Sequence, residues 1–221
     1  MHSGELCMNL TRKQKKWKEI PYVSILLVAI NVFVFLFTYF GEIDLFEVGK
    51  LTVDGVLARG EYQRFLLSMF LHSGLDHIFN NMVILYFMGT MIEKEIGHLP
   101  YGVVYFLSGI GGGMLSLYVK LIQGVTIGSV GASGAIFGLD GLLLAMVLFY
   151  RKPMPYVTPL RVGLMIALSV YSGFTSSHVD NAAHLGGLLT GLILGALFCM
   201  IKRFTKGLPM RMRGRDDDLM D

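Results

Sequence analysis

The sequence is poor in charge and in cysteine. Only 16% of its 221 residues are charged and 53% are hydrophobic, and the mean hydropathy is +0.58. Because a soluble domain carries roughly 25% charged residues, we expect a membrane protein. The two cysteines, Cys7 and Cys199, offer neither a disulfide framework nor the spacing of metal ligands. The net charge is only +3 and the basic residues cluster beside apolar runs, which argues against a nucleic-acid partner.

Long apolar segments predict membrane-spanning helices. A span needs about 20 residues, because the hydrocarbon core is about 30 Å thick and a helix rises about 1.5 Å per residue. The apolar stretch 82–92 reaches only about 17 Å, so the polar residues before it, including His77, Asn80 and Asn81, must also enter the membrane, with Asp76 as the N-cap. We expect six spans. The second contains His77, Asn80 and Asn81 and ends at residue 92, and the other five lie at residues 21–40, 101–123, 132–150, 159–174 and 182–201.

The basic residues predict the orientation of these spans. Lys50, Arg59, Arg64 and Lys120 fall on one side, and the other 15 of the 19 basic residues fall on the opposite side. Positive charge accumulates on the cytoplasmic side of membrane proteins, so both termini are expected there. The predicted fold is an all-α membrane protein, a bundle of six transmembrane helices.

Three sections follow from this topology. Residues 1–20 form a basic cytoplasmic tail, residues 21–203 form the membrane domain and residues 204–221 form a second cytoplasmic tail. The first apolar run is long enough to be an anchor rather than a removed signal. The loops 41–76, 124–131 and 175–181 are expected outside, and the first of these is long enough to be functional or locally folded.

A glycine-rich segment, GSVGASGAIFG at residues 128–138, opens the fourth span and places Ser133 at a helix N-terminus. Unpaired backbone N–H groups and the positive end of the helix dipole can stabilise an oxyanion there. Ser133 is therefore a candidate nucleophile. The alternative is that Ser133 only caps the helix and the glycines only pack.

His184 lies at the start of the sixth span. An ionisable side chain inside a membrane points to a functional site, although it can also be a hydrogen-bonded core residue. Small residues at every fourth position let membrane helices approach closely. Docking of the two glycine stripes predicts that His184 reaches Ser133, the pairing that activates a serine nucleophile. The stripes consist of Gly134 and Gly138 on the fourth span and Gly187, Gly191 and Gly195 on the sixth.

Further side chains share the faces that meet at this point. Phe137, one turn after Ser133, is expected to hold the imidazole by ring stacking, since no carboxylate is placed as in a three-residue triad. Asp140 lies deeper and is predicted to be a buried hydrogen-bonding group. His77 and Asn81 are four residues apart and share one helix face. They are predicted to form an oxyanion hole with the Ser133 backbone N–H, or alternatively to hydrogen-bond between helices.

Together these motifs resemble the rhomboid family of intramembrane serine proteases, over residues 21–203. The motifs are Gly131-Ala-Ser133-Gly134, His184 with Gly187 and Gly191, His72 with His77 and Asn81, Glu61 to Arg64, and Gly89 with Glu93. The resemblance implies that Ser133 is the nucleophile, His184 the base, and His77 and Asn81 the oxyanion donors.

Two positions depart from the family pattern. Gln63 stands where the family often has tryptophan before the loop arginine, which bears on the packing of the first loop. Phe137 stands where the family often has tyrosine, so that ring stacking remains but a hydroxyl is missing.

The resemblance implies a serine endopeptidase that cleaves single-span membrane proteins within or near the bilayer. The fifth span and residues 175–181 would form its lateral gate. The alternative is a catalytically inactive rhomboid-like binder of transmembrane helices, whereas a transporter is disfavoured because no internal symmetry is seen. We expect no metal and no organic cofactor, and as partners transmembrane substrates and the lipid bilayer. The expected location is a bacterial plasma membrane with the active site toward the extracytoplasmic side.

Overall fold

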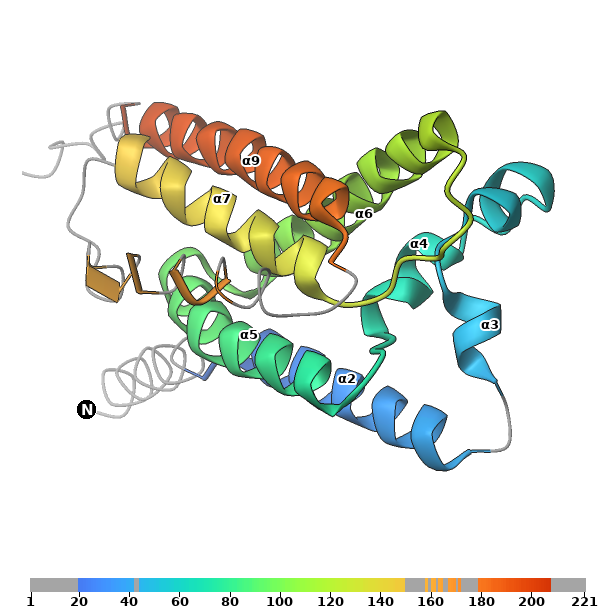
Figure 1. Cartoon of the computed structure of the whole chain (residues 1–221). Helices are drawn as coiled ribbons and strands as arrows, with labels where there is room; N and C mark the ends of the chain where they lie inside the picture. The colour runs from blue at the N-terminus through green and yellow to red at the C-terminus, as the bar shows by residue number, and fades with distance from the viewer. Residues whose placement is uncertain are drawn as a thin grey trace, which may run out of the picture.

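Helices form the architecture of the computed structural model, which describes residues 20–41, 44–149, 158, 160–161, 163–164, 167–169, 171 and 179–207. The long helices are α2 (Tyr22–Phe40), α5 (Leu75–Ile96), α6 (His98–Gln123), α7 (Ser133–Phe149) and α9 (Asn181–Gly207). Figure 1 shows α7 and α9 running side by side, with α2 and α5 together on the other side of the molecule.

Four of the predicted spans match these helices to within a few residues, apart from a longer C-terminal end of α9. The second predicted span is also confirmed as one helix, because α5 includes His77, Asn80 and Asn81. The N-cap of α5 is Gly74, so the prediction that Asp76 caps it is wrong, and Asp76 lies in the first turn. The fifth predicted span, the loop 175–181 and the two tails lie largely outside the described residues.

The composition of the helices identifies a membrane protein. Among the described residues, three helices are long and apolar enough to cross a bilayer, namely α2, α6 and Asn181–Lys202 of α9, and α7 is a shorter apolar helix. Large apolar side chains also point outward, such as Phe33 and Phe79, each 68% exposed. An outward apolar surface on helices is stable when hydrocarbon surrounds it.

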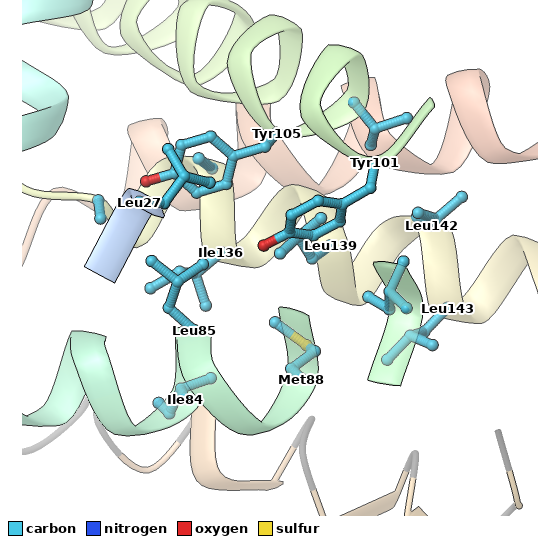
Figure 2. Packing of buried hydrophobic residues seen from close by; sticks show 14 of the residues in the cluster. Leu27, Ile84, Leu85, Met88, Tyr101, Tyr105, Ile136, Leu139, Leu142 and Leu143 are labelled. Atoms are coloured by element: carbon cyan, nitrogen blue, oxygen red, sulfur yellow. The ribbon is translucent and has the colours of Figure 1, made fainter. Parts of the chain in front are cut away.

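The core lies between α2, α5, α6 and α7. Tyr101 and Tyr105 of α6 are fully buried, and Leu85 and Met88 of α5 pack in the same cluster. Figure 2 shows these side chains meeting leucines of α7, including Leu139. This contact positions α7, which carries the candidate nucleophile at its first residue.

Glu93 joins α2 to α5 at the end of the bundle where α2 begins. Its buried carboxylate accepts hydrogen bonds from the backbone N–H groups of Val23 (2.9 Å) and Ser24 (2.8 Å). The first N–H groups of a helix have no partner inside the helix, so the carboxylate satisfies donors that are otherwise unpaired. The carboxylate also lies 2.5 Å from Nδ1 of His98.

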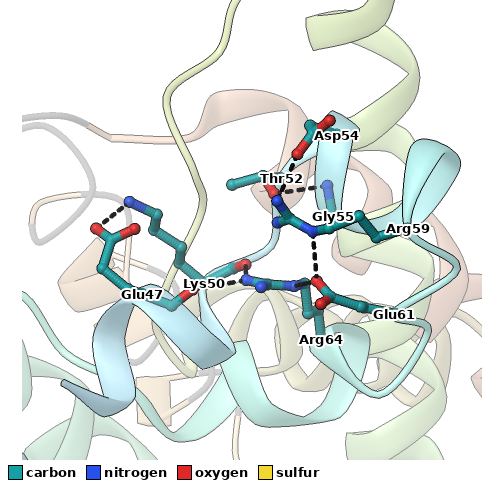
Figure 3. Close-up of polar contacts among 8 residues, drawn as sticks. All are labelled: Glu47, Lys50, Thr52, Asp54, Gly55, Arg59, Glu61 and Arg64. Atoms are coloured by element: carbon teal, nitrogen blue, oxygen red, sulfur yellow. Dashed lines mark hydrogen bonds and ion pairs between the residues drawn. The ribbon is translucent and has the colours of Figure 1, made fainter. Parts of the chain in front are cut away.

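The segment between α2 and α5 is locally folded. It contains α3 (Leu45–Gly49), the π-helical turn η1 (Asp54–Ala58), α4 (Arg64–Leu67) and the 3-10 turn η2 (Ser68–Phe70). Figure 3 shows the polar contacts that organise it around Arg64, whose guanidinium donates to the backbone carbonyls of Glu47 (3.0 Å) and Lys50 (2.7 Å) and to the Glu61 carboxylate (2.6 Å).

Two further contacts secure this segment. The hydrogen bond from Arg64 is the main cause that lowers the pKa of Glu61, which also pairs with Arg59. An isolated antiparallel β-bridge joins Leu51 to Ser129, with backbone N–H to carbonyl distances of 2.9 Å in both directions. The segment between α2 and α5 is thereby bonded to the backbone that leads into α7.

Candidate active site

Ser133 and His184 meet where α7 and α9 begin. Ser133 Oγ lies 2.9 Å from His184 Nε2, within hydrogen-bond distance. His184 is 9% exposed, whereas Ser133 is half-buried. The contact that the two glycine stripes predicted is therefore present, and its serine side is open to an approaching group.

The close approach of α7 and α9 depends on residues without side chains. A Cβ atom added to Gly187 would collide with the carbonyl oxygen of Gly134, and one added to Gly191 would collide with the carbonyl oxygen of Gly138. Any larger residue would separate the helices. All four predicted packing glycines thus lie at the contact that brings Ser133 and His184 together.

Phe137 supports the histidine ring. Its ring centroid lies 4.1 Å from that of His184, with an angle of 11° between the planes, which is a stacked arrangement. Stacking restricts rotation of the imidazole about its own axis and keeps Nε2 directed at Ser133. The phenyl ring is thus stacked on the imidazole, without a hydroxyl, and its orienting role stays a prediction.

His77 and Asn81 of α5 lie beside Gly131, two residues before Ser133. A Cβ atom on Gly131 would stand 2.8 Å from His77 Nε2 and 3.6 Å from Asn81 Nδ2. Asn81 is 3% exposed, and among the described residues its Nδ2 has no hydrogen-bond partner. Because an unpaired buried donor is costly, the amide is suited to a group that arrives with a substrate.

The partner of His77 indicates its tautomer. The Ser73 backbone N–H donates to His77 Nδ1 at 3.5 Å, and Ser73 Oγ lies 3.0 Å from the same nitrogen. Nδ1 is then the acceptor, so the proton of the neutral ring is on Nε2. Two N–H donors, His77 Nε2 and Asn81 Nδ2, consequently face Gly131, two residues before Ser133.

His72 and Asp140 are both buried. His72, at 5% exposure, has its ring centroid 5.0 Å from that of His77 in an edge-to-face contact. Asp140 lies in α7, seven residues after Ser133. Neither carboxylate oxygen of Asp140 has a hydrogen-bond partner among the described residues, so the hydrogen bonding predicted for it is not seen there. Within the part of the chain that the structure describes, no group of three or more histidine, cysteine or acidic residues is arranged to hold a metal ion.

A cluster next to this site was missed from the sequence. Asp180 caps α9 by accepting from the Ala183 backbone N–H at 2.9 Å, and its carboxylate also meets Ser116, Lys120 and Ser129. An aspartate directly before the first residue of a helix is a recognisable N-cap signal, because its side chain can accept from the N–H three residues later. The partners on other elements had no signal in the sequence, because their meeting depends on the fold.

Comparison with known families matches residues 59–201, well over half of the chain, to the Rhomboid domain. The chain belongs to the rhomboid family. The matched region includes His77 and Asn81 of α5, Ser133 of α7 and His184 of α9. The resemblance inferred from the motifs is thereby confirmed.

This rhomboid is similar to curated relatives from three kinds of organism. It is 38% identical over 161 residues to RHOMBOID-like protein 1 of Arabidopsis thaliana, covering 71% of this chain and 40% of the relative. It is 33% identical over 143 residues to Rhomboid protease GluP of Bacillus subtilis, covering 65% of this chain and 27% of the relative. It is 37% identical over 146 residues to Rhomboid-type serine protease 2 of Emericella nidulans, covering 65% of this chain and 28% of the relative.

The chain spans less than half the length of these three relatives. Two of them are named proteases, whereas several plant relatives are named only RHOMBOID-like. Relatives from a plant, a bacterium and a fungus give no support to the predicted bacterial plasma membrane, and one plant relative is named mitochondrial.

Proposed function

We propose that this rhomboid is an intramembrane serine endopeptidase that uses a Ser133–His184 dyad to cleave single-span membrane proteins. The observation that carries the proposal is the 2.9 Å contact between Ser133 Oγ and His184 Nε2. A histidine within hydrogen-bond distance of a serine hydroxyl, with a third group orienting the ring, is the arrangement that activates the nucleophile. Phe137 is the orienting group here.

The proposed acylation begins with attack of Ser133 Oγ on a peptide carbonyl carbon. His184 Nε2 accepts the hydroxyl proton as the new C–O bond forms. The tetrahedral intermediate then breaks its C–N bond, and His184 gives the proton to the leaving amine. The product is an acyl-enzyme ester on Ser133 and a free amine end of the substrate.

The oxyanion of that intermediate would be stabilised by three N–H donors. These are the backbone N–H of Ser133 at the start of α7, His77 Nε2 and Asn81 Nδ2. A preorganised donor in a site sheltered from water commonly contributes a factor of roughly 10² to 10³ in rate. The buried amide of Asn81, which has no protein partner among the described residues, is suited to this role.

Water completes the proposed cycle. A water molecule attacks the ester carbonyl while His184 accepts one of its protons, the bond from carbon to Ser133 Oγ breaks, and His184 returns the proton to that oxygen. The half-buried position of Ser133 supports access by water. The reaction needs no metal ion and no organic cofactor.

We also propose the topology and the substrate route. In this proposal residues 21–203 form a six-span catalytic domain, the tails 1–20 and 204–221 are cytoplasmic, and the site faces the extracytoplasmic side. Substrates would be single-span helices that enter laterally beside the fifth span and residues 175–181. The excess of basic residues at one side supports the orientation.

Cleavage by paired variants tests the proposed function. In detergent or proteoliposomes with a single-span test substrate, Ser133→Ala and His184→Ala are each expected to lower the cleavage rate by roughly 10³-fold or more, because each removes half of the dyad. Thr38→Ala is the control, since it removes a hydroxyl that bonds only within α2. Cleavage by either dyad variant at the rate of Thr38→Ala would refute the assignment.

A catalytically inactive helix binder is the second candidate, because several similar plant proteins are named RHOMBOID-like rather than protease. That candidate predicts that the unaltered protein binds the test substrate without cleaving it. The same assay therefore separates the two, and labelling of Ser133 by a fluorophosphonate gives a second measurement that needs no substrate.

A further inference from the structure

Four polar residues meet beside the Ser133–His184 pair, and we call them the outer polar cluster: Ser116, Lys120, Ser129 and Asp180. Oδ2 of Asp180 accepts hydrogen bonds from Ser116 Oγ and Ser129 Oγ, each at 2.5 Å, and lies 2.9 Å from Lys120 Nζ. Lys120 Nζ also contacts Ser129 Oγ, and the two serine oxygens are 2.9 Å apart.

The cluster joins three elements that are separate in sequence. Ser116 and Lys120 belong to α6, Ser129 lies in the segment that leads into α7, and Asp180 caps α9. The last two are connected to the dyad through the backbone. Ser129 stands four residues before Ser133, and the backbone carbonyl of Asp180 accepts from the His184 N–H at 3.1 Å.

The aspartate is charged in this environment. Burial alone would raise the pKa of the Asp180 carboxyl, but hydrogen bonds from Ser116, Ser129, the Ala183 backbone N–H and Lys120 outweigh it and lower the pKa to about 2. The Asp180 and Lys120 side chains are only 20% and 13% exposed. A shielded ion pair with several hydrogen bonds holds its geometry better than an exposed pair.

The geometry assigns Lys120 to positioning rather than to proton transfer. This lysine does not serve as a base for the serine hydroxyl beside it, because an ammonium group that is ion-paired with a carboxylate acts as a hydrogen-bond donor. The contact of Lys120 with Ser129 therefore orients the segment before Ser133. The acid–base work remains with His184.

We propose that the outer polar cluster is a positioning device for the dyad, setting the separation of Ser133 and His184 by tying the segment before α7 and the start of α9 to α6. This inference rests on the proposed protease function. Reactive groups must be held within a fraction of an ångström, and a displacement of about 1 Å can cost on the order of 10²-fold in rate. Loss of the ion pair would loosen both attachments of the dyad at once.

The first experiment measures the dyad directly in the full-length protein. Asp180→Asn keeps the acceptor for Ala183 but removes the charge, and Lys120→Met keeps the stem but removes the ammonium group. Both are expected to slow fluorophosphonate labelling of Ser133, and kcat for a single-span substrate, by about tenfold or more, while KM changes by less than about twofold. Lys120→Arg, which keeps the charge, is expected to retain most of the rate.

The matched control is Asp54→Asn. It makes the same change in an aspartate paired with Arg59 at 2.7 Å, in the folded segment between α2 and α5. It should label Ser133 at the rate of the unaltered protein. A thermal unfolding curve for each variant gives the folded fraction. If the folded Asp180→Asn and Lys120→Met proteins label at the unaltered rate, the cluster is only structural and the proposal is overturned.

A second measurement does not depend on activity. The 15N resonances of the His184 imidazole report its hydrogen bond with Ser133, and they are expected to shift in Asp180→Asn and Lys120→Met but not in Asp54→Asn. Resonances that stay in place in both cluster variants would overturn the inference. An unaltered protein that neither cleaves nor labels, but whose resonances shift in the variants, would refute the proposed protease function and leave the positioning role standing.

Discussion

Gly131 is the residue on which the proposed oxyanion site depends most directly. Its φ is +120°, a conformation that L side chains rarely adopt. A Cβ atom at this position would also stand 2.8 Å from both Cε1 and Nε2 of His77. The glycine therefore permits the turn before α7 and leaves the space in which His77 and Asn81 approach the backbone two residues before Ser133.

Gly131→Ala is expected to impair catalysis more than stability. The methyl group would displace His77, and loss of one oxyanion donor commonly lowers kcat by roughly 10² to 10³-fold. Gly97→Ala is a close control, because Gly97 has a φ of +93° but, among the described residues, no atom lies within 4 Å of the added Cβ. Steady-state cleavage and thermal unfolding of both variants check this prediction. Equal kcat values in the two variants would show that strain alone, and not His77, governs the effect.

Single residues were predicted best where local spacing carries the information. Ser133 stands at a helix start, and glycines recur at every fourth position. From these two patterns the sequence predicted the contact of Ser133 with His184. Asp180 was missed as a member of the site, since three of its partners lie on α6 and on the segment before α7. A side chain whose partners are distant in sequence leaves no periodic pattern to detect.

At the scale of the helices, the distance between Ser133 and His184 depends on the contact between α7 and α9. Gly138 of α7 faces Gly191 of α9, and an added Cβ on Gly191 would collide with the Gly138 carbonyl oxygen. Membrane helices associate largely through such close van der Waals packing. The distance between Ser133 and His184 is therefore sensitive to a change two turns away.

Gly191→Ala is expected to lower both stability and cleavage. Overpacking of a close contact costs about 1 to 3 kcal/mol, and separation of the helices lengthens the Ser133–His184 distance. Gly102→Ala in α6 is the control, because within the described part of the chain its added Cβ would meet only Val23 Cγ1, at 3.7 Å. Thermal unfolding in detergent and the cleavage rate test this. A Gly191→Ala protein as stable and active as Gly102→Ala would show that the contact tolerates a methyl group.

Elements were predictable to different degrees for a physical reason. The long helices follow from hydropathy, since hydrocarbon requires an uninterrupted run of apolar residues. For the segment between α2 and α5, length alone indicated a functional or locally folded loop, without its helices. Those short helices are organised by Arg64, which donates to the backbone carbonyls of Glu47 and Lys50, 17 and 14 residues earlier. Contacts over such distances in sequence leave no local repeat from which they could be predicted.

At the scale of the whole molecule, the proposed topology makes a prediction about sidedness. In a background without Cys7 and Cys199, a cysteine at Tyr62 should react with a membrane-impermeant maleimide in intact cells. A cysteine at Leu99 should react only after the membrane is opened, because positive charge favours the cytoplasmic side for the α5–α6 junction. Both positions are well exposed, at 68% and 79%.

The control for that experiment is permeabilised cells, in which both cysteines should be labelled. Labelling of Leu99→Cys in intact cells, with Tyr62→Cys protected, would reverse the proposed orientation. Equal labelling of both in intact cells would contradict two-sided placement of the chain. Either result would leave the Ser133–His184 geometry unchanged, because that geometry is internal to the bundle.

The two backbone hydrogen bonds between Leu51 and Ser129 couple the segment between α2 and α5 to the candidate active site. Leu51 is 2% exposed and packs with Val56 and Leu117, so this stretch of backbone is anchored on both sides. In the proposed orientation, a protein or drug that binds residues 44–70 from the aqueous phase would displace the segment that leads into α7. Such a compound would change the rate of the proposed proteolysis without entering the lipid.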